Sequence, residues 1–133
     1  MKYNAGLIKL GIGALLAVTP LLAHHSFSAE YDSKKPVTLK GTVTKIDWMN
    51  PHVYFFIDVE DDAGKVVTWG FEMGPPNLLK NSGWTKNTMK IGDVVIVNGT
   101  LAKDGTNQGN ARTVTMADTG KRLGAGSSEN TTP

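Results

Sequence analysis

Apolar and polar residues alternate over much of the chain between residues 37 and 120, and clusters of turn-forming residues separate the alternating runs. A period of two is typical of β-strands that bury one face. In the clearest run, residues 52–59, one face carries the four apolar side chains Val53, Phe55, Ile57 and Val59. The side chains between them point the other way. The pattern therefore predicts short antiparallel strands.

Five strands and one helix account for the pattern. The expected strands cover residues 37–48, 52–59, 65–72, 93–101 and 110–117. The first contains Gly41, which indicates a bulge or bend. The helix follows the third strand, since Pro75 and Pro76 suit a helix start and Gly83 a helix end. This element order indicates an all-β domain with one short helix, a small five-stranded Greek-key barrel of the oligonucleotide/oligosaccharide-binding (OB) type; a small open sandwich is the alternative.

The turn at Asp61–Gly64 joins the second and third strands into a hairpin. If both apolar faces meet the core, Phe55 lies opposite Trp69 and Ile57 opposite Val67. His52 then lies opposite Glu72 on the other face. The sequence thus predicts that an imidazole and a carboxylate meet at the open end of this hairpin.

Residues 1–23 have the features of an export signal: Lys2 near the start, an apolar stretch from Ile8 to Leu22, and the small residue Ala23 at the expected cut. The stretch is too short and glycine-rich for a permanent span, so we expect cleavage and no stable membrane anchor. The mature protein would be periplasmic or secreted. The chain has no cysteine, which excludes disulfides and thiolate metal sites.

Removal of Lys2 and Lys9 lowers the basic count from 14 to 12, equal to the 12 acidic residues. A balanced charge argues against a nucleic-acid partner. The mature chain then divides into an extended lead-in at residues 24–36, the β domain at 37–120 and a disordered tail at 121–133, whose small and polar residues lack the apolar content to pack.

Cleavage after Ala23 would make His24 the first residue. Its α-amine and ring Nδ1 would then offer two nitrogens to one ion, an arrangement that suits Cu(II). Further candidate ligands are an adjacent imidazole, groups at the open end of the hairpin and two thioethers: His25, His52, Glu72, Met49 and Met73. We therefore predict a copper site. In the competing interpretation, the N-terminal histidines only form hydrogen bonds and His52 closes a strand-entry turn.

A metal-free binding module is the alternative function. Aromatic side chains at Trp48, Tyr54, Phe56 and Trp84 would hold a small ligand, a glycan or an envelope protein. The acidic residues Asp58, Glu60, Asp61 and Asp62 are interpreted as an ordinary hairpin turn rather than a calcium site. No Ser/His/Asp set has a recognisable spacing, so we expect no enzyme.

Several short segments of the chain carry a resemblance to a known group of proteins: His24-His25-Ser26-Phe27, Ala29-Glu30-Tyr31-Asp32, Gly41-Thr42-Val43-Thr44, Asn50-Pro51-His52, Trp69 to Glu72, Gly83-Trp84-Thr85 and Ala111-Arg112-Thr113-Val114. In these segments the chain resembles domain of unknown function family 6152, and the resemblance covers nearly the whole mature sequence. The resemblance implies an exported, OB-like β domain and marks the two histidine motifs, but it implies no reaction. Gly70 departs from the pattern, since a larger residue is expected there.

Overall fold

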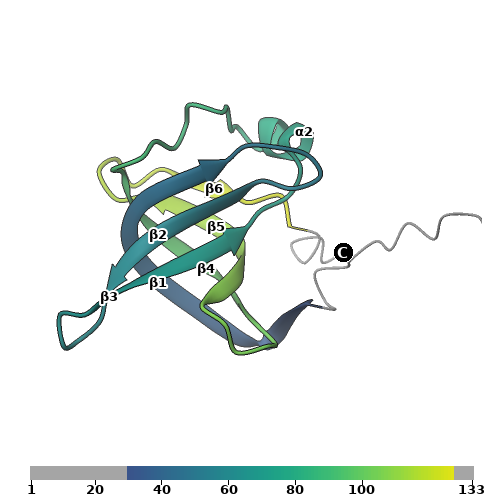
Figure 1. Ribbon diagram of the computed structural model, residues 1–133. Coiled ribbons are helices and arrows are strands. Elements are labelled where there is room, and N and C mark those ends of the chain that lie inside the picture. Colours follow the sequence, from purple (N-terminus) through teal and green to yellow (C-terminus); the bar gives the residue numbers. More distant parts are fainter. Residues whose placement is uncertain (1–29, 128–133) are drawn as a thin grey trace, which may run out of the picture.

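The computed structural model describes residues 30–127 (Figure 1). This part of the chain forms six strands and the short helix α2 (Pro76–Asn81). The strands are β1 (Tyr31–Asp47), β2 (Tyr54–Glu60), β3 (Val66–Glu72), β4 (Val94–Ala102), β5 (Gln108–Met116) and β6 (Arg122–Gly124). Within these residues, no helix has the length and apolar content that a membrane crossing requires.

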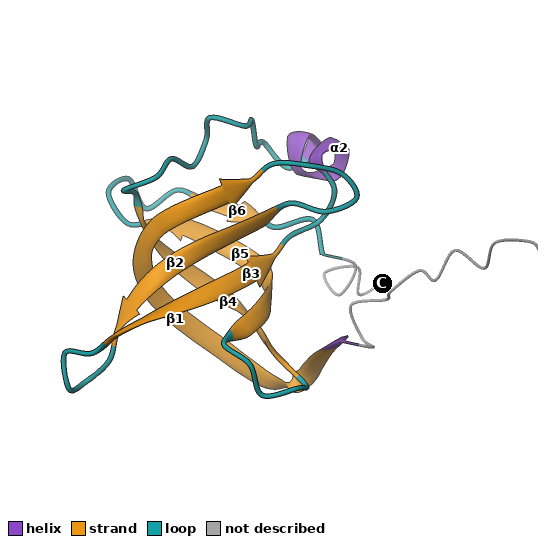
Figure 2. Cartoon of the chain, viewed as in Figure 1, coloured by secondary structure: helices purple, strands orange, loops and turns teal. Residues whose placement is uncertain are grey.

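The strands form one sheet in the order β3-β2-β1-β4-β5-β6, and β3 also pairs with β5. That pairing is parallel and the others are antiparallel. Strands β1 to β5 therefore close into a ring, and Figure 2 shows them wrapped around a common interior with α2 near one end. The five predicted strands and the predicted helix are all present, with the helix between β3 and β4.

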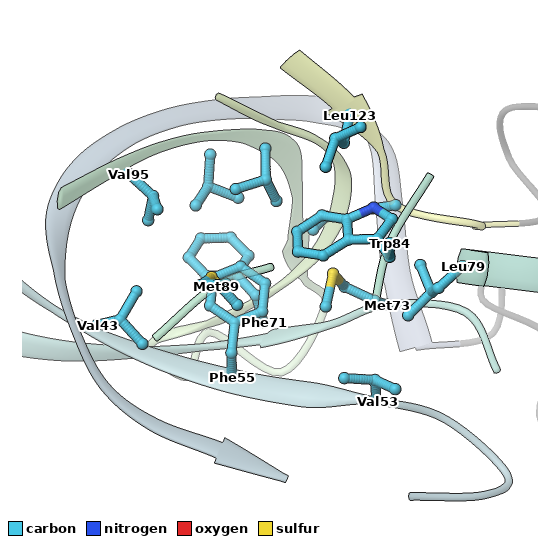
Figure 3. Close-up of a cluster of buried hydrophobic side chains, with 14 of the residues drawn as sticks. Val43, Val53, Phe55, Phe71, Met73, Leu79, Trp84, Met89, Val95 and Leu123 are labelled. Carbon is cyan, nitrogen blue, oxygen red and sulfur yellow. The ribbon is translucent and has the colours of Figure 1, made fainter. Parts of the chain in front are cut away.

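The interior of the ring is filled by apolar side chains from every long strand (Figure 3). The alternation expected for residues 52–59 is confirmed, because Val53, Phe55 and Ile57 are fully buried. The rings of Phe55 and Phe71 stack with their centroids 5.6 Å apart. Burial of such side chains supplies the main driving force for folding.

One close approach in the ring requires a glycine. A Cβ at Gly99 would lie 2.0 Å from the carbonyl oxygen of Asn110, so only glycine lets β4 and β5 approach this closely. The bulge or bend expected at Gly41 is not there, since Gly41 pairs regularly with Val95; the register shift against β2 lies further along β1, between Val43 and Lys45.

The register of the β2–β3 hairpin differs from the prediction by two residues. Phe55 pairs with Phe71, Ile57 with Trp69 and Tyr54 with Glu72. The turn is longer than expected, since Asp61 N–H donates to the Lys65 carbonyl and Gly64 takes a positive φ of 77°. A shift of two residues leaves every side chain on its predicted face.

Two predicted boundaries are wrong. Strand β1 begins at Tyr31 rather than residue 37, because residues 31 and 32 pair with Ala102 and Leu101 of β4. The tail expected to be disordered from residue 121 instead begins with β6; Leu123 in β6 and Ala125 just after it are buried in the core. The predicted export signal and residues 128–133 lie outside the described residues.

Candidate functional site

A row of polar side chains crosses the outer face of the ring at the open end of the β2–β3 hairpin. Strand registers pair Tyr54 with Glu72, Glu72 with Asn110, and Asn110 with Thr100. Paired residues share a face, and the neighbours of Glu72 and Asn110, namely Phe71 and Ala111, point into the core. The row therefore lies opposite the core, although Glu72 is only 4% exposed and Asn110 and Thr100 are fully buried.

Glu72 is the centre of this row. Its Oε1 lies 2.5 Å from Nδ1 of His52, and its Oε2 accepts a hydrogen bond from the Tyr31 hydroxyl at 2.7 Å. The carboxylate thus joins the start of β1 to a residue that stands two positions before β2. Burying a carboxylate is costly unless donors surround it, and here both oxygens have one.

His52 and Glu72 meet as the sequence predicted, but not directly across the strands. Tyr54 occupies the position opposite Glu72, and His52 reaches the carboxylate diagonally from two residues earlier on the same face. The peptide bond between Asn50 and Pro51, just before His52, is cis. The His52 side chain remains 25% exposed, so this imidazole links the buried carboxylate to the surface.

Both tyrosines beside Glu72 are held in the neutral form. Burial raises the pKa of Tyr54 to about 12, and the negative charge of Glu72 and a hydrogen-bonding interaction with it add to the effect. Burial also raises the pKa of Tyr31 well above its ordinary value, and the hydrogen bond to Glu72 adds to this shift. Neutral phenols donate to the carboxylate without adding charge to the cluster.

Asn110 supports the row from β5. Its Nδ2 donates to the backbone carbonyl of Glu72 at 3.3 Å, which holds the end of β3 in place. Its Oδ1 is buried and has no hydrogen-bond partner among the residues that the structure describes. A buried acceptor of this kind is uncommon in folded proteins.

This arrangement fixes how His52 can act. When Nδ1–H donates to Glu72, the ring lone pair lies on Nε2, the nitrogen that binds a metal or accepts a proton. A carboxylate that holds the far nitrogen of a histidine is the usual support of a metal-bound imidazole. Glu72 therefore serves to orient His52, and its own oxygens are engaged by His52 and Tyr31.

The other predicted metal ligands are separated. Met49 is 51% exposed in the loop before His52, whereas Met73 is fully buried in the core, where Figure 3 draws it with Trp84. His24 and His25 lie outside the described residues. Among residues 30–127, no group of three His, Cys, Asp or Glu side chains could hold a metal ion.

The predicted aromatic site is divided as well. Tyr54 is 36% exposed and Phe56 is half-buried, with the Lys45 ammonium 5.3 Å from the centroid of its ring. Trp48 is half-buried and packs against the core. Trp84, predicted as a ligand-binding residue, is instead in the core: it is 2% exposed and donates Nε1–H to the Gly124 carbonyl of β6.

Two surface hollows accompany the ring. The larger, about 550 Å³, lies at the turn end of the hairpin and contains none of the candidate residues; Lys40, Gly41, Thr42, Asp58, Glu60, Val66 and Val94 line it. The smaller, about 320 Å³, lies beside Tyr31, between Glu30 and the β4–β5 loop. The hollow with the larger volume is thus not where the buried polar groups gather.

Sequence reasoning missed Tyr31 and Asn110 as parts of this site. Nothing in the alternation pointed to Tyr31, which was assigned to the lead-in. Asn110 had one usable signal, an amide at the start of a predicted strand beside Gly109, where a polar side chain is easily interpreted as part of a turn.

One comparison with protein families gives a match. The model of the family of unknown function DUF6152 matches residues 14–112, which is most of the chain. The chain belongs to this family. The matched range includes His24, His25, Tyr31, His52 and Glu72, all within a family without an assigned role. No curated protein and no solved structure is significantly similar to the chain.

Proposed function

We propose that this DUF6152 protein is an exported metal-binding domain and that copper is its ion. One observation carries the proposal: a partly exposed imidazole, His52, is held through Nδ1 by a buried carboxylate at the point where the described chain begins. That geometry directs the Nε2 lone pair away from the carboxylate. The leader at residues 1–23 is the reason to place the protein in the periplasm or outside the cell.

Further nitrogen ligands have to come from beyond residues 30–127, since no group of three His, Cys, Asp or Glu side chains in that part of the chain could hold a metal ion. His24 and His25 precede Tyr31 by seven and six residues. An extended chain spans about 3.3–3.6 Å per residue, so a histidine six residues before Tyr31 can reach about 20 Å. Tyr31 and His52 contact the same carboxylate, so they lie close together. A histidine that can reach about 20 Å from Tyr31 can therefore also reach His52.

In the proposed site, His24 supplies its α-amine and Nδ1, and His52 supplies Nε2. His25 completes the set for Cu(II), and the exposed thioether of Met49 favours the reduced ion. Glu72 orients His52 without binding the metal. Met73 is not part of this set, because its side chain lies in the core.

We also infer that the five-stranded ring is an OB-like Greek-key barrel. The strand order and the parallel closure between β3 and β5 support this assignment. In such a ring the His52–Glu72 pair lies on a rigid strand end, which is a suitable support for a metal ligand.

The test is a Cu(II) competition titration of protein exported with its own leader, so that the natural N-terminus forms. We expect one tight Cu(II) per chain, and His52→Gln to weaken binding about 10- to 100-fold and remove one imidazole nitrogen from the electron paramagnetic resonance spectrum. The matched control is Asp58→Asn, on the same face of β2 but at the other end of the hairpin. Equal affinity in His52→Gln and the wild type would refute the proposal.

A second candidate is the metal-free binding module. Tyr54 and Phe56 lie two residues apart on the outer face of β2, and Gly70 opposite Phe56 leaves its ring room against β3. These rings would stack on a sugar or another planar ligand. Under this alternative, a small glycan binds the metal-stripped protein, and binding is lost in Tyr54→Ala but retained in His52→Gln.

A further inference from the structure

We infer that Tyr31 is a positioning residue. It couples the packing of the start of β1, residues 30–32, against the ring to the orientation of His52, and the Glu72 carboxylate carries the coupling. The consequence for metal affinity rests on the proposed function. The coupling itself is a property of the metal-free protein and can be measured there.

An irregularity in β1 brings Tyr31 to the outer face. Asp32 pairs with Leu101 and Pro36 with the next residue of β4, Thr100, so the three residues 33–35 have no partner on β4. An odd number of extra residues reverses the alternation of a strand. Without them Tyr31 would share the inward face of Val37 and Leu39; with them it shares the face of the polar row.

The segment 30–32 contacts the end of β4 and the loop that follows it. Its backbone pairs with Leu101 and Ala102, and the Lys103 N–H donates to the Glu30 carbonyl at 2.9 Å. Residues 33–35 that follow are exposed. Tyr31 is the buried side chain of this segment, at 5% exposure, and its hydroxyl donates to Glu72. Glu72 is therefore the point where the segment is fixed to β3.

The same carboxylate fixes His52. One oxygen accepts from Tyr31 and the other faces Nδ1 of His52, so the plane of the carboxylate is set by both contacts. Loss of the Tyr31 hydroxyl leaves that plane with fewer constraints, and the orientation of the imidazole loosens with it. Coupling between two sites acts in both directions, so an ion bound to His52 must also stabilise the packing of residues 30–32 against the ring.

The experiment compares Tyr31→Phe with Tyr54→Phe in the metal-free protein. Both variants keep the ring and remove a hydroxyl that interacts with Glu72, but only Tyr31 belongs to β1. Long-range ¹H–¹⁵N NMR measures the tautomer of His52, and amide hydrogen exchange measures the opening of residues 31–35 and of Lys103.

We expect both variants to lower the population of the Nδ1–H tautomer. Only Tyr31→Phe should speed exchange in the segment, by about tenfold, the effect of one lost buried hydrogen bond. In a copper titration, Tyr31→Phe should weaken affinity about tenfold, the lower end of the effects known for groups that orient a metal ligand.

An unchanged tautomer in Tyr31→Phe, or equal exchange in the two variants, would overturn the coupling. If the wild type binds no copper but the tautomer and exchange respond as expected, the proposed function fails and the coupling stands. If copper binds the wild type but Tyr31→Phe alters neither the His52 tautomer nor the amide exchange, the proposed function stands and the coupling fails.

Discussion

The two ends of the β2–β3 hairpin both carry carboxylates, but their surroundings differ. At the turn end, Glu60, Asp61 and Asp62 are exposed. At the open end, Glu72 is 4% exposed and contacts side chains from two other parts of the chain, Tyr31 and His52. The number of acidic residues therefore does not mark the site; burial together with donors from distant segments does.

The carboxylates at the turn end serve the local backbone. Asp61 Oδ1 accepts hydrogen bonds from the N–H groups of Ala63 and Lys65, at 2.9 and 2.8 Å. Asp58 accepts from the hydroxyl of Thr68 at 2.6 Å, across the paired strands. These contacts confirm the expected hairpin turn. A solvated turn of this kind adds little to stability, because water competes for each contact.

The largest difference between the two ends should be seen in unfolding. We expect Glu72→Ala to lower the free energy of unfolding by about 3 kcal/mol, since it removes a buried carboxylate that accepts from the Tyr31 hydroxyl and faces Nδ1 of His52. Asp58→Ala should cost about 0.5 kcal/mol. Urea denaturation of both variants measures this contrast, and similar costs at the two ends would refute it.

The tyrosines give a pH-dependent form of the comparison. The chain has three tyrosines, and Tyr3 lies in the leader that cleavage would remove, so the exported protein reports only Tyr31 and Tyr54 at the open end. Absorbance at about 295 nm should show little ionisation near the ordinary tyrosine pKa of about 10, with Tyr54 ionising at about 12.

Because the tyrosine pKa values are raised in the folded protein, its stability should fall at high pH. The folded protein raises both tyrosine pKa values, so their contribution is complete below about pH 10, the unfolded pKa, and is lost as pH rises toward 12. The urea midpoint should fall over that range, and less steeply in Tyr54→Phe. If the urea midpoint falls equally steeply with pH in Tyr54→Phe and in the wild type, groups other than Tyr54 cause the loss of stability.

A change in the turn itself should also have a small effect. Asp61→Ala removes two exposed hydrogen bonds and should lower the free energy of unfolding by about 0.5–1 kcal/mol. The tautomer of His52 should not change, because the turn lies at the far end of the hairpin. A shift of the His52 ring signals in this variant would show that the two ends are not independent.

The alternation along the chain was sufficient to predict the faces of β2 and β3 and the His52–Glu72 contact, but not the register. A two-residue difference in turn length changes which residues pair and leaves the faces unchanged. The contact survives this difference because both side chains are long enough to meet diagonally.

Other features depended on contacts that alternation does not encode. Tyr31 joins the site through the three extra residues 33–35, an irregularity that no periodic pattern reveals. The burial of Trp84 depends on β6, and the short β6 is ordered by the same contacts, so neither could be predicted before the other. Local sequence is a weak guide where a segment is held by distant partners.

Native mass spectrometry of the protein purified from the periplasm is the first measurement to make, because one spectrum gives the mature N-terminus and any bound ion. We expect a chain that starts at His24 and carries about one copper ion, with the copper lost in His24→Ala and its occupancy lowered in His52→Gln. A chain that takes up no added copper, or whose copper occupancy is the same in His24→Ala, His52→Gln and the wild type, would show that this copper site does not exist.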